Sequence, residues 1–135
     1  MFYFLFLLLA CRSEESPSQK ADTKQQIEET TTETDIDVDT LFNRTEAAKK
    51  IIIDVRTPEE YAQGHIIGAK NIPIDKLESR LQELSIYKDQ EIYLVCAVGG
   101  RSHKARVFLT QKGFSKAINV QGGTRGWKAK GYPTK

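Results

Sequence analysis

Two apolar runs constrain the fold of this chain more than any other feature of its sequence. Residues 51–55 read IIIDV and residues 91–96 read EIYLVC, and both are rich in Ile and Val. Strands that are covered on both faces read as continuous apolar runs, whereas half-exposed strands alternate with polar residues. The two runs therefore predict central strands of a parallel sheet, which needs helices on both of its faces.

The segments beside these runs have the period of amphipathic helices. Three leucines, Leu77, Leu81 and Leu84, recur at helical spacing after Asp75, which we expect to be the N-cap of a helix. The segment RSHKARVFLTQKG predicts a second helix that begins at Arg101 and has Gly113 as its C-cap. Its inward side is expected to carry Ala105, Phe108, Leu109 and Lys112.

The segment KAINV is expected to form a further strand. Strands that alternate with helices predict right-handed crossovers and one α/β domain. In open sheets of this kind, ligands bind at the carboxyl ends of the strands. Cys96 lies at such an end.

The chain opens with an apolar run, MFYFLFLLLAC. At about ten residues it is about half as long as a helix that spans a bilayer. Its end, Leu8-Leu9-Ala10-Cys11, resembles the lipobox of bacterial lipoproteins, in which the cysteine is lipid-modified. We therefore expect residues 1–11 to be an export signal with lipidation at Cys11, so that the protein is an exported, membrane-anchored lipoprotein facing the periplasm. No Lys or Arg precedes Cys11, unlike typical signals, and a plain signal or an uncleaved anchor is the alternative.

Residues 12–33 are mostly Ser, Thr, Glu, Gln and Lys, and we expect them to be a disordered tether ahead of a domain at 34–135. Residues 1–40 hold three basic and nine acidic residues, a balance of −6, so the total of +2 leaves +8 for the remainder. A basic body favours a small anion or a lipid surface as partner, and a solvated surface with scattered Lys and no such partner is the alternative. Nucleic acid is not expected, because the basic residues do not cluster with aromatic ones.

The loop after Cys96 carries the chemistry. Its residues Ala97, Val98, Gly99 and Gly100 are followed by Arg101. We expect both glycines to take positive φ angles, so that backbone N–H groups surround the sulfur. The N-terminus of the following helix and the Arg101 guanidinium add positive charge, which favours thiolate over thiol. The pattern indicates a nucleophilic thiolate at the bottom of an anion-binding loop formed by residues 97–101, and an inert buried cysteine is the alternative.

Three segments in order along the chain carry a resemblance to a known family: IIIDVRTPEEYAQGHIIGAKNIP, CAVGGRS and VQGGTRGWKAKGYP. From about Asp35 to Pro133 the chain is similar to the rhodanese-like sulfurtransferase domain. The resemblance implies that the Cys96 thiolate takes a sulfane sulfur from a small anionic donor, thiosulfate or a persulfide, and passes it to a thiol or to cyanide. No metal or organic cofactor is expected.

The resemblance also implies roles for particular residues. Cys96 is the nucleophile and Arg101 the stabilising cation, and the sulfur-binding residues are Ala97, Val98, Gly99, Gly100 and Ser102. Asp54 and Arg56 are expected to be structural supports of the loop. His65 is also expected to be structural, because no second His or carboxylate accompanies it at metal-binding spacing. His103 is expected to face solvent, and Trp127 to pack in the core or as a lid.

Other functions remain open at this stage. Related phosphatases enclose five residues between Cys and Arg, whereas Cys96 and Arg101 enclose four, and the narrower loop favours sulfur transfer. Many family members carry a polar residue where Val98 stands, which leaves the donor open. A non-catalytic, tethered binding module for sulfur carriers or redox partners is the main alternative. A thiol reductant is less favoured, because the domain offers no resolving cysteine.

Overall fold

The two apolar runs form neighbouring strands at the centre of the sheet. β2 (Ile51–Asp54) pairs in parallel with β4 (Ile92–Val95), and Ile51 lies opposite Ile92. All four residues of β4 are fully buried. Because both faces of β4 are covered, the run has no polar alternation, as its sequence predicted.

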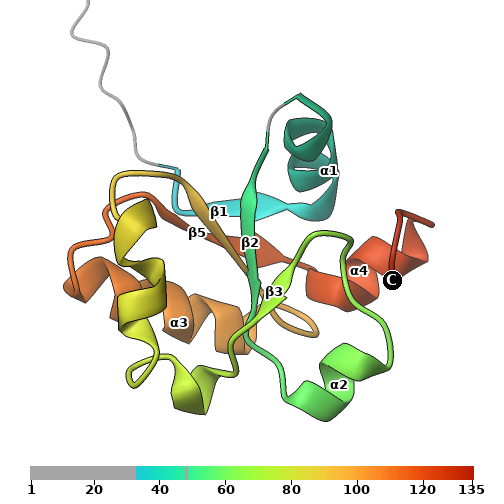
Figure 1. The fold of residues 1–135 in the computed structure, drawn as a ribbon. Helices are drawn as coiled ribbons and strands as arrows, with labels where there is room; N and C mark the ends of the chain where they lie inside the picture. The colour runs from blue at the N-terminus through green and yellow to red at the C-terminus, as the bar shows by residue number, and fades with distance from the viewer. Residues whose placement is uncertain (1–32, 48) are drawn as a thin grey trace, which may run out of the picture.

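The computed structural model describes residues 33–47 and 49–135, with only the backbone for residues 45–47. The sheet has five strands in the order β1-β5-β4-β2-β3, and all neighbouring pairs are parallel (Figure 1). The remaining strands are β1 (Asp35–Asp37), β3 (Lys70–Asn71) and β5 (Ala117–Gln121). The helices are α1 (Val38–Ala47), α2 (Pro58–Ala62), α3 (Gly100–Gln111) and α4 (Gly123–Ala129).

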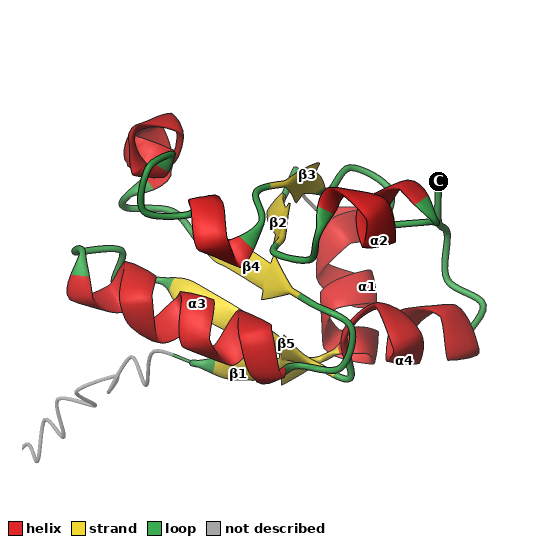
Figure 2. Cartoon of the chain, turned by 90° about the horizontal axis from the view of Figure 1, so that it is seen from below, coloured by secondary structure: helices red, strands yellow, loops and turns green. Residues whose placement is uncertain are grey.

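Helices cover both faces of this sheet, which confirms the predicted α/β architecture (Figure 2). On one face α3 packs through Ala105 and Leu109. On the other face α1 and α4 contribute Leu41 and Trp127 to a second cluster of buried side chains. The sheet is therefore the middle of three layers, and the carboxyl ends of its strands open toward the N-terminus of α3.

The predicted helix after β4 is confirmed with a small shift in its start. α3 begins at Gly100 rather than Arg101, and it ends at Gln111. Gly113 follows with a φ of 93°, the left-handed conformation that commonly terminates a helix. Ala105 and Leu109 are buried as expected and Phe108 is partly buried, but Lys112 is exposed, because the helix ends before it.

The predicted helix after Asp75 is wrong in type. The segment forms two 3₁₀ helices, η1 (Ile74–Lys76) and η2 (Leu81–Tyr87), and Asp75 lies inside η1 instead of capping it. Two serine hydroxyls supply a reason, because Ser79 donates to the carbonyl of Lys76 and Ser85 to that of Gln82. Such local bonds compete with the α-helical pattern. Leu77 and Leu84 are nevertheless buried, so their spacing predicted burial correctly.

The predicted export signal with Cys11, and the predicted tether up to residue 32, lie outside the described residues. The first described residue, Glu33, forms an ion pair with Arg44 of α1. The carbonyl of Thr34 then accepts a hydrogen bond from the amide of Asn119, 2.8 Å away, and β1 begins. Across residues 33–47 and 49–135, no helix has both the length and the apolar character to cross a bilayer.

Candidate active site

The sulfur of Cys96 lies at the carboxyl end of β4, at the bottom of a tight loop. The residue is 1% exposed. The amide of Gly99 donates to Sγ at 3.0 Å, and the hydroxyl of Ser102 lies 3.3 Å from it. The chain therefore curls around the sulfur and presents hydrogen-bond donors to it, as the sequence predicted for this loop.

These donors have an electrostatic consequence for the thiol. Burial raises the pKa of Cys96, because it disfavours the charged form. Hydrogen bonding from the Ser102 hydroxyl, and then from the backbone amides of Ser102, Gly99 and Val98, lowers the pKa. The lowering effects prevail, and the pKa of Cys96 lies below the ordinary value of a cysteine.

The two glycines of the loop differ in conformation. Gly99 has a φ of 126°, which an L-residue rarely adopts, and it immediately precedes α3. Gly100 does not have a positive φ and is the first residue of α3, and a β-carbon there would meet open space, with no neighbouring segment within 4 Å. The expectation that both glycines take positive φ is therefore wrong for Gly100, because the helix has already begun there.

The N-terminal segment of α4 is hydrogen-bonded to the backbone of the cysteine loop. Three backbone amides, from Gly122, Thr124 and Arg125, donate to the carbonyls of Val98, Cys96 and Ala97 at 3.0, 2.8 and 3.1 Å. With the loop carbonyls bound on this side, its amides are left to face the sulfur. The sequence interpretation assigned no role to this contact, although the repeated glycines at 122 and 123 are its visible signal.

Gly123 allows this close approach. A β-carbon there would lie 2.2 Å from the carbonyl oxygen of Cys96 and 2.6 Å from that of Ala97. Its φ of 53° is also left-handed. Both facts restrict the position to glycine, because a side chain would push α4 away from the loop.

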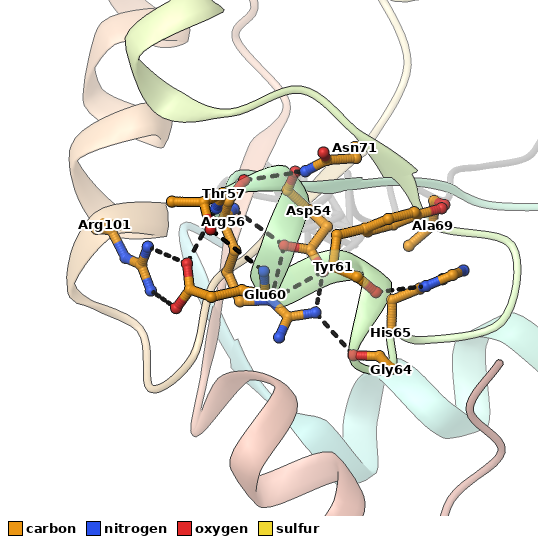
Figure 3. Close-up of polar contacts among 10 residues, drawn as sticks. All are labelled: Asp54, Arg56, Thr57, Glu60, Tyr61, Gly64, His65, Ala69, Asn71 and Arg101. Atoms are coloured by element: carbon orange, nitrogen blue, oxygen red, sulfur yellow. Dashed lines mark hydrogen bonds and ion pairs between the residues drawn. The ribbon is translucent and has the colours of Figure 1, made fainter.

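Asp54 and Arg56 form a buried ion pair at the end of β2. The side chains are 1% and 6% exposed, and Arg56 donates to both carboxylate oxygens of Asp54, with a closest distance of 2.7 Å. Arg56 also donates to the carbonyl of Gly64 at 2.9 Å (Figure 3). Asn71 closes the arrangement by donating to the carbonyls of Asp54 and Arg56, both at 3.0 Å.

This pair braces the chain between β2 and β3, and it has no hydrogen bond with residues 96–102 among the described residues. Its support of the cysteine loop is thus indirect, through the neighbouring strand: the amide of Val55 donates to the carbonyl of Val95 at 2.9 Å. His65 lies farther along, where its ring stacks on Tyr61 with 3.6 Å between centroids and Nδ1 lies 3.0 Å from the Tyr61 carbonyl. These contacts are those of a residue that shapes the turn.

Arg101 forms an ion pair that the sequence interpretation did not anticipate. Its Nη1 and Nη2 atoms donate to the two carboxylate oxygens of Glu60 in α2, at 2.7 and 2.8 Å (Figure 3). Glu60 also accepts the amide of Thr57 at 3.0 Å, while the Thr57 hydroxyl accepts the amide of Glu60, a capping box. The hydrogen bond to Arg101 is the main reason why the pKa of Glu60 falls to about 2.

The remaining predicted residues lie at the rim or in the core. Val98 is 55% exposed beside the sulfur, and His103 is exposed on the first turn of α3. Trp127 is buried, and its ring nitrogen donates to the carbonyl of Pro133 at 2.9 Å. In the part of the chain that the structure describes, no three His, Cys, Asp or Glu side chains come together as a metal site would require. Cys96 is the one cysteine among the described residues, and it is free.

Comparison with known proteins agrees with this geometry. Residues 37–130 match the rhodanese-like domain family. A sulfurtransferase of Allochromatium vinosum is 33% identical over 100 residues, which is 73% of this chain and 92% of that protein. A chloroplastic thiosulfate sulfurtransferase of Arabidopsis thaliana is 39% identical, over 62% of this chain and 78% of that one. The crystal structure of a rhodanese-related protein from Thermoplasma volcanium has a TM-score of 0.68 at 33% identity, covering 76% of this chain and 97% of that one.

Proposed function

The chain belongs to the rhodanese-like domain family, and from that premise we propose that it transfers sulfane sulfur through a persulfide on Cys96. The donor is thiosulfate or a thiol persulfide, and the acceptor is a thiol or cyanide. One observation carries this proposal: the buried sulfur of Cys96 receives hydrogen bonds from the Gly99 amide and the Ser102 hydroxyl. Those donors stabilise negative charge on that sulfur or on a second sulfur bound to it.

The reaction has two displacements at sulfur. The Cys96 thiolate attacks the outer sulfur of the donor, a new S–S bond forms, and the old S–S bond breaks with its electron pair on the leaving group. That leaving group is sulfite when the donor is thiosulfate, and a thiolate when it is a persulfide. The acceptor then attacks the outer sulfur of the Cys96 persulfide, and the Cys96 thiolate is regenerated. No external oxidant or reductant is needed, and a base is not needed when the thiol is already ionised.

Mass spectrometry of the intact protein tests the first displacement. After incubation with either donor, we expect a mass increase of about 32 Da, one sulfur atom. The increase should be located on Cys96 and should be absent from Cys96→Ser. If neither donor produces the adduct, sulfur transfer is contradicted, and the fold would instead serve as a tethered binding module.

We further propose that the protein is exported and held on a membrane by lipid at Cys11, facing the periplasm. The support is the sequence around Leu8-Leu9-Ala10-Cys11 alone. Growth with labelled palmitate should label the wild-type protein but not Cys11→Ala. Label that survives the substitution, or no label on either protein, would contradict lipidation at this residue.

A further inference from the structure

Two arginine–carboxylate ion pairs lie at the cysteine loop or at the end of the neighbouring strand. Two arginines lie near the carboxyl edge of β2 and β4, and each is bound by a carboxylate of its own. Arg56 is bound by Asp54 and Arg101 by Glu60, so these four side chains have no net charge. If Arg101 is to attract an anionic donor, its guanidinium must be at least partly free of the Glu60 carboxylate.

Glu60 is held in place from two sides. The Thr57 amide binds one carboxylate oxygen, and Arg101 binds both (Figure 3). Two parallel N–H to oxygen bonds of this kind are geometrically specific and stronger than neutral hydrogen bonds. The carboxylate is therefore a fixed negative charge beside the cysteine loop, at the first turn of α3.

Arg101 still interacts with the site. The Cys96 thiolate contributes to raising the pKa of Arg101, after the larger effect of Glu60. Arg101 adjoins Ser102, whose hydroxyl lies 3.3 Å from the Cys96 sulfur, so the guanidinium projects from the same first turn of α3. The Glu60 carboxylate keeps Arg101 charged and offsets its positive field. The carboxylate of Glu60 and the guanidinium of Arg101 are thus paired on the helix turn that also supplies a hydrogen-bond donor to the sulfur.

We propose that Glu60 determines donor selectivity at this site, by reducing the attraction of Arg101 for an anion so that a singly charged thiol persulfide is favoured over doubly charged thiosulfate. This inference rests on the proposed function. Coulomb energy scales with the charge of the donor. Removing the negative charge of Glu60 therefore changes the binding energy of a dianion about twice as much as that of a monoanion. Glu60 does not touch the reacting atoms in this arrangement and is a specificity-determining residue.

The test measures the first displacement alone, so that no acceptor complicates it. The rate of Cys96 persulfide formation is followed by quenched mass spectrometry against donor concentration, with thiosulfate and with the persulfide of 2-mercaptoethanol. In Glu60→Gln, half-maximal loading should need roughly tenfold less thiosulfate. Surface charges change the local concentration of a charged substrate by about 10- to 1,000-fold, and this estimate takes the lower end of that range. For the singly charged persulfide, the same reasoning gives about threefold. The maximal loading rate should change little with either donor.

Glutamine is the appropriate replacement, because it can keep the capping box with Thr57 and so retains α2. The matched control is Glu83→Gln, which makes the same change in net charge. Glu83 is paired with Arg80 at 2.6 Å, and its side chain is 38% exposed against 35% for Glu60. It belongs to η2 and contacts none of residues 96–102 in the described structure. We expect its loading kinetics to match the wild type.

Added salt provides a second readout. The advantage of Glu60→Gln for thiosulfate should shrink as ionic strength rises, because salt screens partly exposed charges. Equal changes for both donors, lower loading with both, or the same change in Glu83→Gln would overturn the selectivity role and leave sulfur transfer intact. If the wild type and Glu60→Gln load from neither donor, the proposed function fails, and this inference fails with it.

Discussion

At the scale of single residues, the sulfur of Cys96 has donors of two kinds. The Gly99 amide belongs to the backbone and is retained in any side-chain variant, whereas the Ser102 hydroxyl can be removed. Ser102 is fully buried, so no water replaces its hydroxyl without a rearrangement. The contribution of Ser102 to the reactivity of the thiol can therefore be measured separately.

We predict that Ser102→Ala raises the pKa of Cys96, since the hydroxyl is the largest of the effects that lower it. A hydrogen bond to a charged group contributes about 1.5 kcal/mol, so the ratio of thiolate to thiol at a given pH should fall roughly tenfold. Alkylation with iodoacetamide across a range of pH measures this fall. Ser85→Ala, which removes an exposed hydroxyl in η2, is the control. An unchanged alkylation profile in Ser102→Ala would show that the backbone amides alone lower the pKa.

Glu60 gives a second prediction, on pH. Its folded pKa of about 2 lies below the reference value of 4.5, so Arg101 favours the ionised form. Stability from this pair is fully present above the unfolded pKa and is lost as the pH falls through the folded one. NMR of the side-chain carboxyl should show Glu60 still mostly ionised at about pH 3, where an ordinary glutamate is protonated. In Arg101→Ala the midpoint should return toward the ordinary range, and a normal midpoint in the wild type would contradict the ion pair.

At the scale of elements, the cysteine loop depends on the position of α4. The amides at the start of α4 bind the loop carbonyls, and Gly123 lets the two backbones meet. Gly100, by contrast, begins α3 and has open space around it. The same substitution, glycine to alanine, can therefore be compared at Gly123 and Gly100 to isolate the effect of the close contact.

Gly123→Ala should lower the free energy of unfolding by more than about 2 kcal/mol, because the new methyl overlaps backbone atoms and the φ is left-handed. It should also slow sulfur loading of Cys96, since the loop loses its support. Gly100→Ala should change stability by less than about 1 kcal/mol, in either direction. Urea denaturation and the loading assay measure both variants. Comparable stability losses at the two positions would mean that the contact of α4 with the loop is not what restricts Gly123.

The Asp54–Arg56 pair joins β2 to the turn at Gly64 and to β3. In Asp54→Asn the guanidinium of Arg56 keeps its charge in a buried site without its carboxylate partner. Breaking a buried pair in this way costs about 3 to 5 kcal/mol. Glu83→Gln, which breaks an exposed pair, should cost less than about 1 kcal/mol. A small loss in Asp54→Asn, measured by urea denaturation, would mean that water or Gly64 compensates Arg56.

At the scale of the whole molecule, the sequence predicted the elements whose signals are local and strong. β2, β4, β5 and α3 follow from apolar runs or from helical spacing and a terminal glycine. β1 and β3 were not predicted, because strands of three and two residues carry no periodicity and exist only through pairing with β5 and β2. The 3₁₀ helices share their leucine spacing with an α-helix and are distinguished by serine hydrogen bonds that spacing does not show.

The candidate site was predictable in the same uneven way. The donors around Cys96 follow one another within seven residues, so their convergence can be inferred from the loop alone. The partner of Arg101 lies 41 positions away, and no local pattern joins the two. The capping box at Thr57, which was not predicted, fixes one side of Glu60, and only the folded chain shows that its other side meets α3.

The direction of β1 has a practical consequence. The chain approaches β1 from the amino side of the sheet, with Glu33 paired to the far end of α1, whereas Cys96 opens on the carboxyl side. A fluorophore attached at Glu33 itself would therefore lie at the opposite edge of the sheet from the sulfur, and the protein could be immobilised through that residue with the Cys96 side facing solution. A handle at Lys135 would not be equivalent, because the backbone of Lys135 is bonded to His65 beside α2.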